Sequence, residues 1–148
     1  GMQVAKLRTG VVLEPDQGAL PEIMKPVKLG LGAALVSVKQ WFSWIHRQDL
    51  SGIYFHMIQN RMSGVYNGVA PNPVTNKTLT QGVAKALGKK VILPPVPGFV
   101  LNVALGERAL LVLEGQKVSA AKIVDSGYRF EFPEFFGNMY YLEHSVVL

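Results

Sequence analysis

The run from Val4 to Leu13 constrains the fold of this chain more than any other segment. It reads V-A-K-L-R-T-G-V-V-L, is rich in β-branched residues, and ends at the stop formed by Glu14-Pro15-Asp16. Because its apolar residues are nearly continuous at the far end, the run predicts a largely buried strand. Buried strands of this kind lie inside parallel sheets with neighbours on both sides. This one opens the chain, so we expect half of its neighbours to be missing.

The remainder of the chain alternates between strand-like and helix-like patterns. The first half is expected to form a helical turn at Leu20–Val27 ended by Pro26, an aromatic strand at Gln40–His46, a helix N-capped by Asp49 and closed by Gly64, and a strand at Val65–Ala70. A helix from Thr75, with Gly88 just past its end, a strand at Val91–Leu93 and apolar helices from Pro97 to Leu105 and near Ala109–Leu113 are expected next. A short helix capped by Ser119 and a period-two strand or extended hook from Tyr128 to Phe132 complete the expected elements. This order predicts an α/β fold with few short strands, in one domain over residues 1–148.

Residue types exclude the common metal and disulfide frameworks. Cysteine is absent, so neither a disulfide nor a thiolate zinc site can form. The three histidines, at positions 46, 56 and 144, are too dispersed to indicate a metal triad. We therefore expect no metal site.

Hydropathy predicts a soluble protein, and the absence of cysteine fits a cytoplasmic one. The most apolar stretch, Pro94 to Leu113, is broken by Pro97 and by the Glu107-Arg108 pair, which argues against a membrane span. Gly1-Met2 has the form of a tag remnant before a start codon. The sequence leaves open whether Met2 is a native start or a fragment boundary.

The formal net charge of +5 raises the question of nucleic-acid binding. The lysines are scattered, however, and no stripe of arginines interleaves with aromatic residues as single-strand binding requires. We expect no nucleic-acid partner. A basic patch for an anionic cofactor or a phosphorylated substrate fits the charge at least as well.

The chain lacks two motifs on which nicotinamide chemistry depends. The cluster from Gly30 to Leu35 nearly matches the dinucleotide fingerprint, but Leu35 replaces the third small residue and no strand precedes Gly30. None of the five tyrosines has a lysine four positions later, so the usual general acid/base is missing. The sequence therefore predicts no catalytic residue for hydride transfer.

The segment from Trp41 to Asp49 holds the densest group of special residues. Its aromatic residues suit a hydrophobic core, and they also suit a pocket wall of Trp41 or Trp44 with His46 and Arg47 at the edge. Arg8 interrupts an apolar strand, so a buried arginine there needs a carboxylate or phosphate partner. Asn67 lies at a strand end, where a side-chain amide ties loop backbone or contacts a ligand.

Four motifs resemble, in order, the later half of an atypical short-chain dehydrogenase/reductase. They are L-R-T-G-V-V-L-E-P-D-Q-G-A-L-P (Leu7–Pro21), Q-W-F-S-W-I-H-R-Q-D-L (Gln40–Leu50), G-V-Y-N-G-V-A-P-N-P-V-T-N (Gly64–Asn76) and a proline-centred P-x-F before L-G-E (Pro97–Glu107). The similar group is the epimerase family proteins, which resemble nucleoside-diphosphate-sugar epimerases and carry a C-terminal domain of unknown function. The similarity runs from about Val4 to Pro133. The chain departs from the pattern at Gln48, which replaces an acidic residue, and at Arg108, where the family has methionine.

The resemblance implies a partial Rossmann-type fold in which this chain is the C-terminal, substrate-binding portion of an NAD(P)-dependent epimerase or dehydratase. The missing half would carry the NAD or NADP turn and the tyrosine-lysine pair, so no cofactor is expected on this chain alone. The implied cofactor-side residues are Arg8, Thr9 and Gly10. Those implied to line or brace the cleft for a small, nucleotide-sugar-like substrate are Trp41, Trp44, His46, Arg47 and Asn67.

Two other functions remain open at this stage. A stand-alone ligand-binding or self-associating module predicts a homodimer through the unpaired edge of the Val4–Leu13 strand. An independent hydrolase or lyase needs His46 and Asp49 within hydrogen-bond reach of each other in a pocket.

Overall fold

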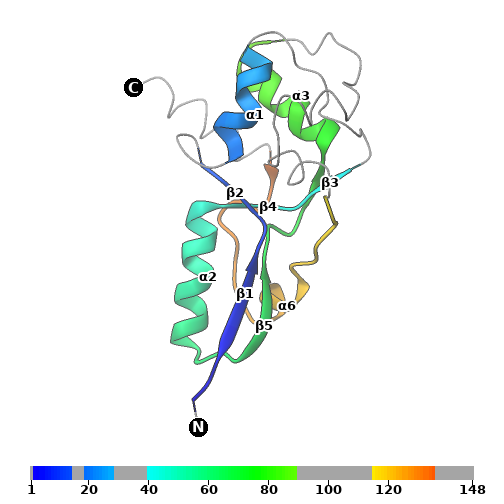
Figure 1. Cartoon of the computed structure of the whole chain (residues 1–148). Helices are drawn as coiled ribbons and strands as arrows, with labels where there is room; N and C mark the ends of the chain where they lie inside the picture. Colours follow the sequence, from blue (N-terminus) through cyan, green and yellow to red (C-terminus); the bar gives the residue numbers. More distant parts are fainter. Residues whose placement is uncertain (1, 15–18, 29–39, 90–114, 136–148) are drawn as a thin grey trace.

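A computed structural model of the chain describes residues 2–14, 19–28, 40–89 and 115–135. In chain order, its elements are β1 (Ala5–Thr9), β2 (Val11–Leu13), α1 (Ala19–Lys28), β3 (Trp41–Phe42), β4 (Trp44–His46), α2 (Arg47–Gln59), β5 (Gly64–Gly68), β6 (Val74–Thr75), α3 (Asn76–Ala86) and α6 (Ala121–Asp125). Short strands are interspersed with helices (Figure 1), which confirms the predicted α/β class. The glycine cluster at 30–35 and the elements expected between 91 and 113 lie outside the described residues.

The predicted strand over Val4–Leu13 forms, but it changes partner at Gly10. β1 pairs in parallel with β5, β2 pairs in parallel with β4, and β3 and β6 form a short antiparallel pair. At the change, Gly10 N donates to Gly68 O and Val11 N donates to Ser43 O, both at 3.0 Å. A Cβ at Gly10 would lie 2.6 Å from Ser43 O, so the close approach of the two strands requires glycine.

Burial along this strand differs on the two sides of Gly10. β1 is exposed except for the half-buried Leu7, whereas Leu13 at the end of β2 is fully buried. The expectation of a largely buried strand is therefore wrong for β1, because β5 is the only strand paired with it among the described residues. Arg8 is exposed as well, so the expected buried arginine with an obligatory anionic partner is also wrong.

Two hydrophobic clusters hold the described elements together. The first joins α1, α3 and the ends of β2 and β4, and its buried members include Leu13, Leu20, Trp44 and Val83. The second lies between α2, β5 and α6, and is built around Ile45, Ile53, Met57, Val69 and Ile123. Figure 1 shows the corresponding division, with α1 and α3 at one end of the molecule and α2, β1, β5 and α6 at the other.

Helix α1 continues through Pro26, so the predicted end at that residue is wrong. Proline in a helix interior removes one backbone hydrogen bond and costs about 3 kcal/mol. Three side chains that flank it in the helix, Ile23, Met24 and Val27, are buried in the first cluster, and their packing offsets that cost.

Helix α3 forms as predicted. Thr75 is its N-cap, and the Thr75 Oγ1 accepts a hydrogen bond from Thr78 N at 3.2 Å. Leu79 and Val83 are buried on one face. Gly88 follows the end with φ of +63°, the left-handed conformation that glycine adopts at little steric cost.

Helix α2 ends earlier than the sequence predicts. Gly64 was expected to close it, but the helix ends at Gln59, and Arg61 adopts the left-handed conformation with φ of +46°. Arg61 N donates to Ile58 O at 3.1 Å and Met62 N donates to Met57 O at 3.0 Å. These two bonds form a Schellman motif with arginine at the position that usually holds glycine. Gly64 instead begins β5.

No helix in the described part of the chain is both long enough and apolar enough to span a lipid bilayer.

Candidate functional site

His46, and not Asp49, is the N-cap of α2. The His46 Nδ1 accepts a hydrogen bond from Gln48 N at 3.2 Å, and its backbone is extended. Asp49 lies one turn inside the helix and is 1% exposed. The prediction of an Asp49 N-cap is therefore wrong, because the histidine ring supplies the capping acceptor three positions earlier.

The Asp49 carboxylate binds the chain at residues 128–132 instead. Its Oδ1 accepts hydrogen bonds from Tyr128 Oη at 3.0 Å and from Glu131 N at 2.8 Å, and its Oδ2 accepts from Phe132 N at 2.9 Å. Tyr128 Oη also lies 3.1 Å from the Asp49 carbonyl oxygen. Of the two alternatives for this segment, the extended hook is confirmed, because no strand forms there. Asp49 is thus a buried clamp that joins α2 to the hook.

The hook also covers His46. The rings of His46 and Phe132 lie 3.9 Å apart between centroids and are inclined by 33°. Burial lowers the pKa of His46 from its ordinary value of 6.5, more than the nearby Asp49 raises it. Burial and the Asp49 carboxylate raise the pKa of Tyr128. Both groups are therefore neutral at pH 7, and the His46 and Asp49 side chains each bond to other groups rather than form a hydrolase pair.

Trp44 is a core residue. It is 0% exposed, its Nε1 donates to Asn72 O at 3.1 Å, and its ring meets Phe135 edge to face at 5.6 Å. Full burial places its ring out of reach of a ligand at the surface, so its structural role is to hold the Asn72 loop and the end of the hook.

Arg47 is exposed at the start of α2 and pairs with Glu14. Its Nη1 lies 3.0 Å from Glu14 Oε1, and the two side chains are 62% and 22% exposed. An ion pair with this exposure contributes at most about 1 kcal/mol, so the guanidinium can exchange Glu14 for an anionic ligand at small cost.

Trp41 has different contacts from His46 and Arg47. It is 36% exposed, and Lys117 Nζ lies 4.6 Å from the centre of its ring. Ser43, which lies between Trp41 and Trp44, binds the backbone on both sides of Lys117. The Ser43 Oγ donates to Gln116 O at 2.6 Å and accepts from Val118 N at 3.0 Å. Sequence reasoning did not identify Lys117, because its neighbourhood depends on contacts between residues more than 70 positions apart.

Asn67 also binds the backbone of this part of the chain, at Ser119. Its Nδ2 donates to Ser119 O at 3.0 Å, and it pairs in register with Arg8 across β1 and β5. Lys122 Nζ donates to Val65 O at 2.8 Å and lies 4.4 Å from the centre of the Tyr66 ring. Asn67 thus ties loop backbone, one of the two roles predicted for it.

A surface groove of about 460 Å³ follows the carboxyl end of β5. Its lining residues are Pro71, Pro73, Lys117, Val118, Ser119, Ala120, Ala121, Val124 and Asp125. Its size lies within the range of small-molecule sites, and ligands of parallel α/β sheets bind beyond the carboxyl ends of the strands. Lys117 and Ser119 connect this groove to Trp41 and Asn67. We define it as the Lys117 groove.

The three predicted cofactor-side residues lie together at the carboxyl end of β1. Arg8 and Thr9 are exposed there, whereas Gly10 packs against Ser43 and Val69 and so has a structural reason to be glycine. Among the described residues, no glycine-rich turn joins a strand to a helix, and no group of three His, Cys, Asp or Glu residues could hold a metal ion. The role of Arg8 and Thr9 toward a cofactor stays a prediction, and no phosphate-binding turn of this kind occurs among the described residues.

Comparison with known proteins relates the chain to one family. A family model described as "Domain of unknown function (DUF1731)" matches residues 96–136. The mouse epimerase family protein SDR39U1 is 42% identical over 130 residues, which are 86% of this chain and 44% of that protein. The chain thus spans less than half the length of this relative.

Solved structures agree with the sequence relationship. The crystal structure of human epimerase family protein SDR39U1 (isoform 2) with NADPH has a TM-score of 0.86 at 38% identity, over 96% of this chain and 48% of that one. The nucleoside-diphosphate sugar epimerase from Corynebacterium glutamicum has a TM-score of 0.71 at 29% identity, over 95% of this chain and 26% of that one. These matches confirm the predicted resemblance and the Rossmann-type fold.

Proposed function

Because this chain is a homologue of the epimerase family proteins, we propose that it forms the substrate side of an NAD(P)-dependent epimerase or dehydratase. It holds a nucleoside-diphosphate-sugar-like substrate, while the cofactor is held by the nucleotide-binding half that the family resemblance implies. On its own, the chain binds substrate and carries out no hydride transfer.

The Lys117 groove carries this proposal. A nucleoside diphosphate presents a flat base and a strongly anionic diphosphate. The exposed Trp41 ring offers a stacking surface, and the Lys117 ammonium that lies 4.6 Å from it offers a phosphate partner. Asp125, which also lines the groove, offers an acceptor for sugar hydroxyls.

The other predicted substrate residues are not among those that line this groove. Asn67 positions the groove through its bond to Ser119 O. Trp44 and His46 are buried, so they brace the cleft rather than contact substrate. Arg47 is accessible beside Glu14 and offers a partner for an anionic group. Arg8 and Thr9 face the nicotinamide of a cofactor held elsewhere.

Titration with UDP-glucose as the probe tests this function, with tryptophan fluorescence as the readout. Trp41 is exposed and Trp44 is buried, so substrate contact changes the emission of one of the two tryptophans. We expect saturable binding that Lys117→Ala weakens about tenfold, the loss of one charge-assisted phosphate contact. The matched control is Lys85→Ala, an exposed lysine on α3 outside the groove. Equal affinities for the two variants, or no saturable binding by the unmodified chain, would contradict the proposal.

A further inference from the structure

Four exposed lysines gather where two packed helices end. Lys25 and Lys28 lie in the last turn of α1, Lys85 lies in the last turn of α3, and Lys89 follows that helix. The two helices pack together in the first hydrophobic cluster and run toward the same end of the molecule, which is uppermost in Figure 1. We define these four residues as the α1–α3 lysine cluster.

The acids of the same helices do not balance this positive charge. No acidic residue occurs between Thr75 and Lys89, and the one acid of α1, Glu22, lies in the first half of that helix. In the part of the chain that the structure describes, the side chains of Lys28, Lys85 and Lys89 form no ion pair or hydrogen bond. Packed helices lie about 8–10 Å apart, close to the Debye length of about 8 Å at physiological salt, so the fields of the four ammonium groups add.

Helix stability explains only part of this arrangement. A lysine in the last turn stabilises a helix through the helix dipole, and one lysine for each helix supplies that effect. The additional lysines destabilise the folded chain, because like charges at one end of the molecule repel each other. An anionic surface placed against the cluster removes this repulsion.

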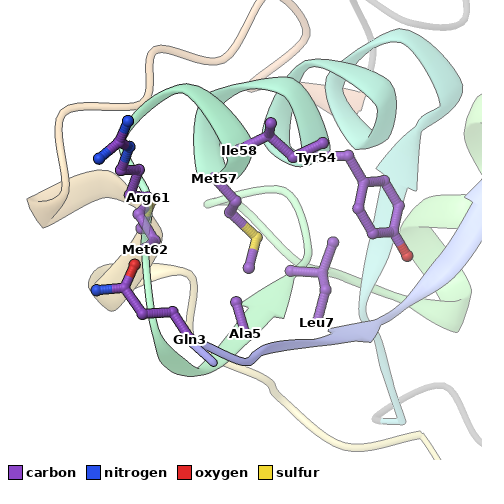
Figure 2. Close-up of a pocket in the computed structure, with 8 residues that line it drawn as sticks. All are labelled: Gln3, Ala5, Leu7, Tyr54, Met57, Ile58, Arg61 and Met62. Carbon is purple, nitrogen blue, oxygen red and sulfur yellow. The ribbon is translucent and has the colours of Figure 1, made fainter. Parts of the chain in front are cut away.

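The cluster offers no apolar anchor for a folded protein partner. Among the side chains that the structure describes, the large apolar ones that are exposed lie outside α1 and α3. Tyr54 and Ile58, for example, line a groove of about 350 Å³ between α2 and β1 (Figure 2). Protein–protein interfaces depend on aromatic, apolar or arginine anchors that become buried on binding, and the lysine cluster has none of these.

The residue type also favours a lipid surface over a nucleic acid. The cluster holds no arginine for bidentate contacts and no aromatic ring on which a base could stack. An anionic leaflet spreads its charges over a plane, and lysines on two adjacent helices can reach such a plane together. Groups of about four to eight basic residues on amphipathic helices are typical of binding to anionic lipids.

We propose that the α1–α3 lysine cluster docks the protein on a membrane surface that carries anionic phospholipid headgroups. The contact is electrostatic, because the apolar faces of both helices are buried in the first hydrophobic cluster and are not free to enter the bilayer. The Lys117 groove includes residues of α6, which lies at the other end of the molecule, so the two surfaces are separate (Figure 1). Membrane docking does not depend on the proposed substrate.

Co-sedimentation of the purified chain with lipid vesicles tests this docking. Vesicles of phosphatidylcholine and phosphatidylserine should bind the chain at physiological salt and release it at about 1 M salt, where the Debye length falls to about 3 Å. Vesicles of phosphatidylcholine alone should not bind it. Each lysine near an anionic leaflet strengthens binding about fivefold, so Lys85→Gln combined with Lys89→Gln should weaken it about 25-fold. Lys6→Gln combined with Lys117→Gln is the matched control, since it removes the same charge at exposed lysines outside the cluster.

A second variant tests the other helix. Lys28→Gln on α1 should weaken vesicle binding about fivefold, and circular dichroism melting checks that every variant folds. Absence of binding to the anionic vesicles, or equal weakening by the two double variants, would overturn the proposal. Binding to duplex DNA that depends on Lys85 and Lys89, without binding to vesicles, would overturn it in favour of a nucleic-acid partner.

Discussion

Replacement of Asp49 by asparagine removes the clamp between α2 and the hook at residues 128–132. The substitution preserves size and shape, so its effect reports on the carboxylate rather than on packing. Asparagine retains one oxygen, which can still accept from Tyr128 and Glu131. Its amide group replaces Oδ2, however, and brings a donor against the Phe132 N–H, 2.9 Å from the present acceptor.

The expected loss of stability follows from these bonds. A hydrogen bond to a charged group contributes about 1.5–3 kcal/mol, and leaving a buried donor unsatisfied costs about 1–3 kcal/mol. The two remaining bonds to Oδ1 weaken when the acceptor becomes neutral. We therefore expect Asp49→Asn to lower the free energy of unfolding by about 3 kcal/mol, a large fraction of the stability of a small domain.

Urea denaturation followed by circular dichroism measures this difference. Asp125→Asn is the matched control, because it makes the same chemical change at an exposed position on α6 and should alter the free energy of unfolding by less than about 0.5 kcal/mol. Limited proteolysis should also cut the hook of the Asp49 variant first. A loss below about 1 kcal/mol for Asp49→Asn, similar to the control, would refute the reasoning.

Four further substitutions test separate parts of the structure. Because burial lowers the pKa of His46, the unfolded chain takes up the proton first, and stability is lost as the pH falls below 6.5; His46→Asn keeps a capping acceptor and should flatten this decline in urea melts at pH 7.5 and 5.5. The raised pKa of Tyr128 stabilises the fold below pH 10, a contribution that is lost as the pH rises above 10; Tyr128→Phe should remove that alkaline decline and cost about 1 kcal/mol at neutral pH. Arg61→Gly should raise the free energy of unfolding by about 0.5–1 kcal/mol by relieving the left-handed conformation, whereas Gly88→Ala should lower it by about 1 kcal/mol; effects of the opposite sign would contradict the left-handed conformation of these two residues.

Local signals in the sequence predicted the local parts of the fold. The Thr75 cap and the apolar spacing of Leu79 and Val83 specify α3, because every interaction that defines the helix lies within a few residues. Gly88 marks its end for the same reason. The parallel pairing of the first strand was also correct, since a β-branched run of this kind belongs inside a parallel sheet.

Interactions between distant residues account for the errors. Asp49 has the form of an N-cap, but its partners at Tyr128, Glu131 and Phe132 lie about 80 positions away, and no local pattern reveals them. Arg8 is exposed because only one strand pairs with β1 among the described residues.

The candidate site was predicted only in part for the same reason. The sequence singled out Trp41 and Asn67, and both lie beside the Lys117 groove. It also grouped Trp41 with His46 and Arg47, which contact other residues than Trp41 does. Neither Lys117 nor Ser119 belongs to a recognisable sequence motif. Their place beside Trp41 and Asn67 depends on the hydrogen bonds from Val118 N to Ser43 Oγ and from Asn67 Nδ2 to Ser119 O.

A fluorescence titration of NADPH with the purified chain tests most directly whether this polypeptide supplies only the substrate side. Human epimerase family protein SDR39U1, which has been crystallised with NADPH, is the positive control. We expect the human protein to give a saturable change and this chain to give none, because the described residues contain no phosphate-binding turn. Saturable binding of NADPH by this chain alone, with a Kd near about 1 μM, would contradict the account.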